Sequence, residues 1–98
     1  MDGKLRIGAG QDDDELVVSG VLDIGTSALL EAAIAELRND GHESVSLHLS
    51  GVTFIDSRGL RSLLVAAAAG PLTLRSPSFA IRRLLTLTNT DGEFTIVG

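Results

Sequence analysis

The 98-residue sequence predicts an α/β fold, a mixed β-sheet of about four to five strands with helices mainly on one face. Apolar runs rich in β-branched residues alternate with longer segments whose apolar residues recur at helical spacing. The helical segments link strand candidates, the arrangement in which right-handed crossovers join parallel strands. The first two strand candidates are instead separated by a short polar loop, which predicts a hairpin and makes the sheet mixed.

The first half of the chain contains the hairpin and one helix. We expect strands at residues 4–7 and 16–22 around a polar loop at 8–14, then a helix from about 27 to 40. Gly20 inside the second strand indicates a bulge or a close backbone approach. Thr26 or Ser27 can cap the helix at its start, and Gly41 can take the left-handed conformation at its end.

The second half contains two further strand–helix units. We expect strands at residues 45–49 and 72–75, helices at 57–69 and 77–87, and an edge strand or irregular tail at 93–97. A turn at Ser50–Gly51 is expected to lead into a short apolar run before the helix at 57. Ser76 followed by Pro77 predicts the cap and the first residue of the third helix. The amphipathic stripe of that helix includes Phe79, Ile81, Leu84, Leu85 and Leu87.

The composition suits one compact domain that spans residues 1–98. Hydrophobic residues make up 44% of the chain and its three aromatic residues are all phenylalanine, which predicts one mainly aliphatic core. The sequence has no cysteine, so it forms neither a disulfide nor a thiolate metal site, and this is compatible with a cytoplasmic location. No apolar run approaches the roughly 20 residues of a membrane-spanning helix, so we expect no membrane insertion.

The charge argues against direct binding of nucleic acid. The formal net charge is -5, and the acidic cluster at residues 12–15 supplies much of the negative charge. Proteins that bind nucleic acid usually present a basic surface, whereas the basic residues here are scattered apart from Arg82–Arg83. We interpret the acidic cluster as a solvated turn.

The sequence offers no convincing catalytic, metal or nucleotide site, and we expect no cofactor. Ser57 lies between a strand and a helix, but Ile55 occupies a position where the nucleophile elbow of α/β-hydrolases has glycine. No pattern places His42 or His48 beside Ser57, and without cysteine the two histidines are a poor set of metal ligands. The glycines in residues 8–10 lack the rest of a phosphate-binding fingerprint.

The junction at Asp56–Ser57 is the most informative part of the sequence. A strand-like run ends there and a helix-like run begins at once, so the serine hydroxyl lies at or beside a helix N-terminus. A serine at this position can cap the helix. A phosphate on the same serine would lie at the positive end of the helix dipole. The residues alone leave both interpretations open, a cap and a switch.

A second junction has the same character. Asp23 also ends a predicted strand just before a helix, and the carboxyl ends of parallel strands meet along one edge of a sheet. Asp23, Thr26, Asp56 and Ser57 are therefore candidates for one polar cluster. The alternative is that all four are caps and turn formers, and patterning alone favours that alternative.

Three segments of the sequence resemble STAS domains, and more narrowly the bacterial anti-sigma factor antagonists. The main one is residues 45–60, which end in Phe-Ile-Asp-Ser-Arg-Gly-Leu. The others are Gly-Val-Leu-Asp at 20–23 with Thr26, and the predicted third helix at 76–88. Their order and spacing extend the resemblance over roughly residues 15–95 and imply a STAS-like fold.

The resemblance implies a regulatory binding protein that is not an enzyme. In this family the serine directly after the aspartate, here Ser57, is phosphorylated by an anti-sigma factor with serine-kinase activity. The unphosphorylated antagonist binds the anti-sigma factor and frees the sigma factor; phosphorylation ends the binding, and a phosphatase restores it. The partner-binding residues implied by the resemblance are Asp23, Thr26, Asp56, Ser57, Arg58, Gly59 and Arg61.

The sequence departs from the family pattern beside the serine. Arg58 stands where a small residue is usual, and Arg61 where glycine is frequent. Two arginines at this site can pair with a phosphate or suit an acidic partner. An alternative function is a STAS subunit of a transporter, such as a lipid-transport ATPase, or of a sensory complex. Ser57 would then act only as a cap in a constitutive docking module.

Overall fold

The computed structural model describes residues 4–98, which form a five-stranded mixed sheet and three α-helices. The elements in chain order are β1 (Leu5–Ala9), β2 (Glu15–Leu22), α1 (Ser27–Asn39), β3 (Val45–Ile55), α2 (Ser57–Ala69), β4 (Leu72–Arg75), α3 (Phe79–Thr88), the 3₁₀ helix η1 (Asp91–Glu93) and β5 (Thr95–Val97). The strands lie in the order β1-β2-β3-β4-β5. The β1–β2 pair is antiparallel and the other three pairs are parallel, as the predicted hairpin and crossovers require.

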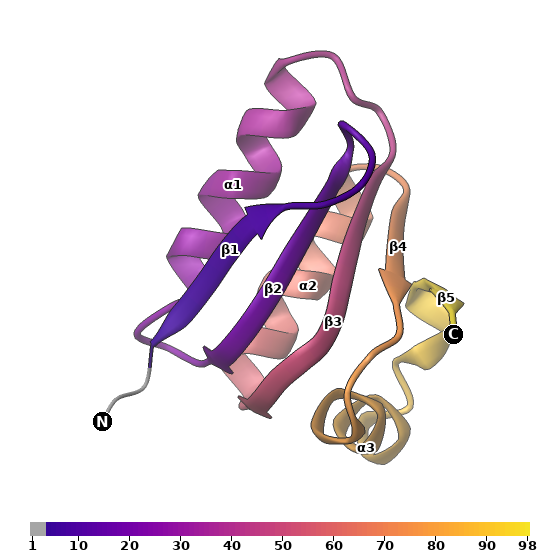
Figure 1. The fold of residues 1–98 in the computed structure, drawn as a ribbon. Coiled ribbons are helices and arrows are strands. Elements are labelled where there is room, and N and C mark those ends of the chain that lie inside the picture. The colour runs from indigo at the N-terminus through magenta and orange to yellow at the C-terminus, as the bar shows by residue number, and fades with distance from the viewer. Residues whose placement is uncertain (1–3) are drawn as a thin grey trace.

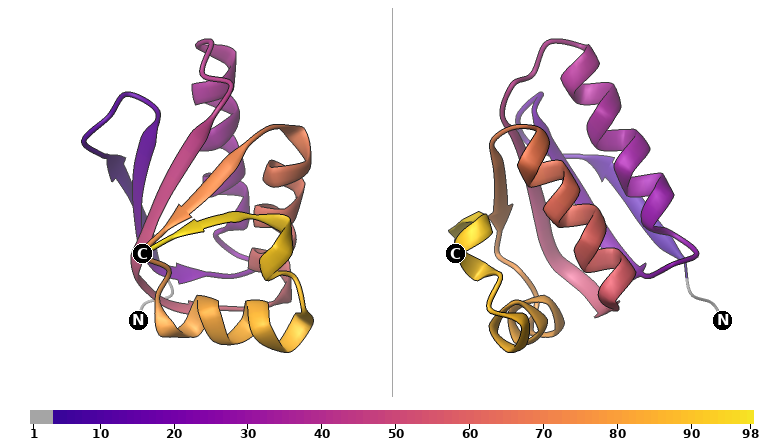
Figure 2. Two further views of the ribbon diagram at one scale, coloured as in Figure 1. Left: turned by 90° about the vertical axis from the view of Figure 1, so that its right-hand side faces the viewer. Right: turned by 180° about the vertical axis from the view of Figure 1, so that it is seen from behind.

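The helices α1 and α2 lie side by side on one face of the sheet (Figures 1 and 2). The alternation in β3 explains this layering, because Val45, Leu47 and Leu49 are buried whereas Ser46 and His48 are partly exposed. The third helix, α3, lies beside the end of β3 (Figures 1 and 2). Aliphatic residues from the strands and from all three helices form one core, as expected.

The first half of the fold matches the predicted elements closely. Gly20 has a φ of 99° and sits at a register shift between β2 and β3, which confirms the predicted irregularity. Gly41 follows α1 with a φ of 103°, as predicted for its end. No helix within residues 4–98 is long and apolar enough to cross a membrane.

The strand β3 is longer than predicted. It runs unbroken from Val45 to Ile55, so the turn expected at Ser50–Gly51 is wrong. The glycine lies opposite Ser19 of β2, and a Cβ on Gly51 would come within 2.8 Å of the Ser19 Cβ. Gly51 therefore allows two strands to approach closely where their register shifts, and it does not end the strand.

The third helix begins later than predicted. Its N-cap is Ser78, whose Oγ accepts a hydrogen bond from the backbone N of Ile81 at 3.4 Å, so the assignment of Ser76 as cap and Pro77 as first residue is wrong. The backbone N of Ser76 instead donates to the carbonyl oxygen of Val97 at 2.7 Å, and its φ is 47°. Pairing with the strand β5 thus holds Ser76 outside the helix.

The acidic cluster is only partly a solvated turn. Asp12 and Asp13 are exposed, but Glu15 is buried as the first residue of β2. Its Oε1 accepts a hydrogen bond from the backbone N of Gln11 at 2.9 Å, and its Oε2 lies 3.5 Å from the Nε of Arg75. Burial of this carboxylate is compatible with the fold because both of its oxygens have partners.

Candidate functional site

The two polar junctions meet at one edge of the sheet. Leu22 at the end of β2 pairs with Ile55 at the end of β3, so Asp23 and Asp56 leave the sheet side by side. The backbone N of Asp56 donates to the carbonyl oxygen of Leu22 at 3.2 Å and joins the two junctions. The structure therefore places Asp23, Thr26, Asp56 and Ser57 along a single edge, where α1 and α2 begin.

The N-terminus of α2 is capped by Asp56. Its Oδ1 accepts hydrogen bonds from the backbone N of Arg58 at 3.0 Å and of Gly59 at 2.9 Å. Ser57 is the first residue of the helix, and its side chain is exposed. Within residues 4–98 the Ser57 hydroxyl has no hydrogen-bond partner. The interpretation of Ser57 as the cap is therefore wrong, because Asp56 caps the helix.

Asp23 and Thr26 build the turn between β2 and α1. The Asp23 Oδ1 accepts from the backbone N of Gly25 at 2.9 Å. The Thr26 hydroxyl donates to the carbonyl oxygen of Val21 at 2.7 Å and accepts from the backbone N of Asp23 at 3.0 Å. Thr26 is 6% exposed and forms no cap hydrogen bond with α1, contrary to the prediction for its hydroxyl. Both residues fix the shape of the edge.

Gly59 brings the first turn of α2 against the end of β2. A Cβ at this position would collide with the carbonyl oxygen of Leu22 and lie 2.9 Å from the Leu22 Cγ. Gly59 is consequently buried. Gly59 sets the position of α2 against β2, whereas Ser57, Arg58 and Arg61 are the solvent-exposed residues of the site.

Four arginines lie on the helices α2 and α3. Arg58 and Arg61 are exposed on the first two turns of α2, and Arg61 follows Ser57 by four residues, on the same side of the helix. Arg82 and Arg83 belong to α3, which lies beside this edge. Within residues 4–98, no carboxylate lies within ion-pair distance of Arg58, Arg61 or Arg83. The structure thus places two exposed arginines on α2 and two on α3.

Comparison with known families assigns the chain. The profile of a family described as "Mlab, STAS domain" matches residues 5–98. The chain belongs to the STAS domain family. Comparison with curated proteins yields no significant match.

Solved structures similar to this STAS domain include several anti-sigma factor antagonists. An anti-sigma factor antagonist from Mycobacterium paratuberculosis is 27% identical, with a TM-score of 0.82 over 99% of this chain and 88% of that chain. A putative antagonist from Thermotoga maritima is 24% identical, with a TM-score of 0.76 over 96% and 86%. Unphosphorylated SpoIIAA is 17% identical, with a TM-score of 0.69 over 97% and 89%. The last two similarities support the fold alone.

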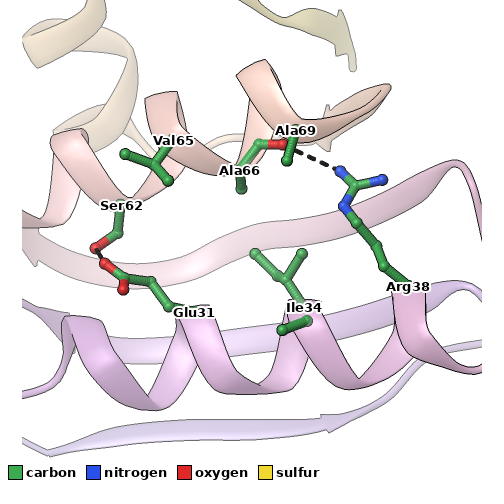
Figure 3. A pocket seen from close by; sticks show the side chains of 8 residues that line it. Glu31, Ile34, Arg38, Ser62, Val65, Ala66 and Ala69 are labelled. Atoms are coloured by element: carbon green, nitrogen blue, oxygen red, sulfur yellow. Dashed lines mark hydrogen bonds between the residues drawn. The ribbon is translucent and has the colours of Figure 1, made fainter.

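A pocket of about 170 Å³ lies between α1 and α2 of the STAS domain, away from the edge (Figure 3). Its lining is mainly apolar, with Ser62 bonded to Glu31 at one end and Arg38 at the other. The Arg38 Nη2 donates to the carbonyl oxygens of Ala66 and Gly70 at 3.1 and 3.2 Å. These contacts join the two helices and close the C-terminal end of α2. Within residues 4–98, no group of three or more histidine, aspartate or glutamate side chains is placed to hold a metal ion.

Proposed function

We propose that this STAS domain is an anti-sigma factor antagonist that binds an anti-sigma factor when unphosphorylated and is switched off by phosphorylation at Ser57. The proposal is based on the different roles of Asp56 and Ser57 at the start of α2. Asp56 caps the helix, so the exposed Ser57 hydroxyl is available to a kinase without loss of the cap. The similarity to the antagonist from M. paratuberculosis supports the same function.

A phosphate at Ser57 would act on the interface and leave the fold intact. A phosphoserine carries about −1.5 to −2 charges at pH 7. At a helix N-terminus that charge is favoured by the dipole, and Arg61 lies within reach on the same side of α2. The folded state therefore tolerates the modification. The cost falls on the complex, through added bulk, desolvation and repulsion from carboxylates of the partner.

The contact surface in this proposal has two layers. Ser57, Arg58 and Arg61 touch the partner, because they are the exposed members of the site. The turn residues and the cap beneath them fix the position of that surface; they are Asp23, Thr26, Asp56 and Gly59. The domain performs no chemistry itself. It controls transcription in the bacterial cytoplasm through protein binding, with phosphorylation by a serine kinase that is the anti-sigma factor and reversal by a phosphatase.

Phosphate incorporation tests the assignment of Ser57. The domain is incubated with its anti-sigma factor and ATP, and the phosphorylated position is found by mass spectrometry. We expect a single phosphate in the wild type and none in Ser57→Ala. The exposed Ser44 serves as a matched control, since Ser44→Ala should be labelled like the wild type. Unchanged labelling of Ser57→Ala would refute the proposal.

The description of the matching family favours a second candidate, because it names Mlab and not a sigma regulator. In this candidate the domain is a subunit of a transporter or sensory complex, and the same edge docks constitutively. The substitution Ser57→Asp separates the two functions. A loss of several-hundredfold in affinity, about 3–4 kcal/mol, is expected for the switch, and little change is expected for constitutive docking.

A further inference from the structure

A groove of about 430 Å³ lies between the end of β3 and the helix α3. Phe54 and Ile55 line it from β3, and Phe79, Arg83 and Leu87 line it from α3. We call it the α3 groove. Ile55 directly precedes the Asp56–Ser57 junction, so the groove opens beside the proposed phosphorylation site.

The α3 groove gathers large apolar side chains at the surface. Phe54, Phe79 and Leu87 are 51%, 77% and 70% exposed. Two of the three phenylalanines of the chain therefore line one exposed groove. The amphipathic stripe predicted for this helix includes Phe79 and Leu87, but Ile81 and Leu85 are the residues that α3 buries. Exposed apolar clusters with aromatic members are typical of protein-binding surfaces.

The groove also carries a positive charge at its centre. Phe79, Arg83 and Leu87 are spaced by four residues, so they lie along one side of α3 with the arginine between the two apolar side chains. Within residues 4–98, Arg83 has no acidic partner. The whole chain has a net charge of -5, so the positive charge of Arg83 is opposite in sign to the overall charge. The surface is complementary to a segment in which apolar side chains flank a carboxylate.

We propose that the α3 groove binds an acidic amphipathic segment of the partner protein. Apolar side chains of that segment pack against Phe54, Phe79 and Leu87, and a carboxylate pairs with Arg83. The inference rests on the proposed function in one respect: a phosphate on Ser57, two residues after the groove residue Ile55, would repel this acidic segment. It also identifies a surface that does not include the Asp56–Ser57 junction.

The preference of the groove can be measured with peptides. A display library of random peptides of about 16 residues, long enough to form an amphipathic helix, is panned against the intact domain. We expect recovered peptides to carry Asp or Glu between apolar residues spaced three or four apart. Their affinity should fall at least about tenfold for Phe79→Ser and for Arg83→Glu. Recovery of no peptide, or of peptides without acidic residues, would overturn the proposal.

Matched variants make the result specific to the groove. Val65→Ser removes an apolar side chain of α2 that is 54% exposed but lies outside the groove, and should leave peptide affinity unchanged. Arg83→Glu should bind more tightly when the carboxylates of a recovered peptide are replaced by lysine. Because Phe79 is exposed, thermal unfolding of Phe79→Ser should match the wild type; unchanged peptide binding by this folded variant would refute the groove. Peptide binding needs no phosphate. If Ser57 is phosphorylated as expected but no peptide binds, the proposal for the α3 groove is refuted and the proposed function is not.

Discussion

The two ends of α2 are completed in different ways. At the C-terminal end, the guanidinium of Arg38 reaches across from α1 and donates to the carbonyl oxygens of Ala66, Gly70 and Pro71 at 3.1–3.3 Å. At the N-terminal end, a neighbouring residue suffices, because Asp56 accepts from two backbone N–H groups of the first turn. Hydrogen bonds from Arg38 therefore satisfy the carbonyl groups at the C-terminal end of α2. The local cap at the N-terminal end leaves the neighbouring side chains exposed to solvent.

This difference predicts separate roles for Arg38 and for the exposed arginines at the other end of α2. Arg38 donates its hydrogen bonds to backbone carbonyls. Its substitution should lower the free energy of unfolding and leave the contacts with the partner unchanged. Arg58 and Arg61 are exposed at the other end, where their substitution should change partner binding and leave stability nearly unchanged. The comparison can be tested by substitutions on both ends, ordered here by the size of the expected effect.

The largest loss of stability is expected for Arg38→Ala. The substitution leaves several carbonyl oxygens at the end of α2 and in the following loop without their donor, and it removes a link between α1 and α2. We expect the free energy of unfolding to fall by about 2–3 kcal/mol, measured by urea denaturation. Arg61→Ala is the matched control and should stay within about 0.5 kcal/mol of the wild type. Equal effects of the two substitutions would contradict the contrast between the ends.

A smaller loss is expected for Gly59→Ala at the N-terminal end. The added methyl group would press the first turn of α2 away from the carbonyl oxygen of Leu22, and the bond from Asp56 to the same oxygen limits the adjustment. Destabilisation of about 1–2 kcal/mol is expected, together with weaker partner binding. Thermal unfolding measures the loss of stability. Gly92→Ala is the control and should be nearly neutral in this measurement, because a Cβ there meets open space.

Removal of the cap should cost less again. We expect Asp56→Ala to lower the free energy of unfolding by about 1 kcal/mol, because two N–H groups of the first turn lose their acceptor. Asp56→Asn should retain most of the stability, since an amide oxygen can still accept. Chemical denaturation compares the three proteins. If both variants match the wild type, Asp56 is not the energetically important cap.

The smallest effect is expected for Ser57→Ala. The hydroxyl is exposed and makes no hydrogen bond within residues 4–98, so its removal should change the free energy of unfolding by less than about 0.5 kcal/mol. Comparing the free energies of unfolding of Ser57→Ala and Asp56→Ala tests whether Asp56, and not Ser57, is the cap. A loss for Ser57→Ala as large as that for Asp56→Ala would return the capping role to the serine.

Most of the fold could be predicted from local patterns. The bounds of α2 agree because apolar spacing marks its face and Gly70–Pro71 marks its end. The start of α3 was missed because a contact distant in sequence, from Ser76 to Val97 of β5, overrides the local start signal. Gly51 was assigned to a turn for a similar reason, since its role depends on the approach of Ser19 from another strand.

The candidate site was predictable only in part. The rule that parallel strands end at one edge of a sheet brought Asp23 and Asp56 together in the sequence analysis, as the structure does. Which of two adjacent polar residues caps the helix depends on backbone geometry that residue types do not specify. The α3 groove depends on how α3 lies against β3, and nothing in the spacing of Phe79 and Leu87 distinguishes an exposed from a buried apolar stripe.

The central claim is that Ser57 controls the interface without supporting the fold. The most direct measurement pairs two quantities on Ser57→Asp, the free energy of unfolding and the affinity for the anti-sigma factor by calorimetry. We predict stability within about 1 kcal/mol of the wild type, since a negative charge is favoured at this helix end, and affinity lower by more than about a hundredfold. Unchanged affinity in the folded variant would contradict the account.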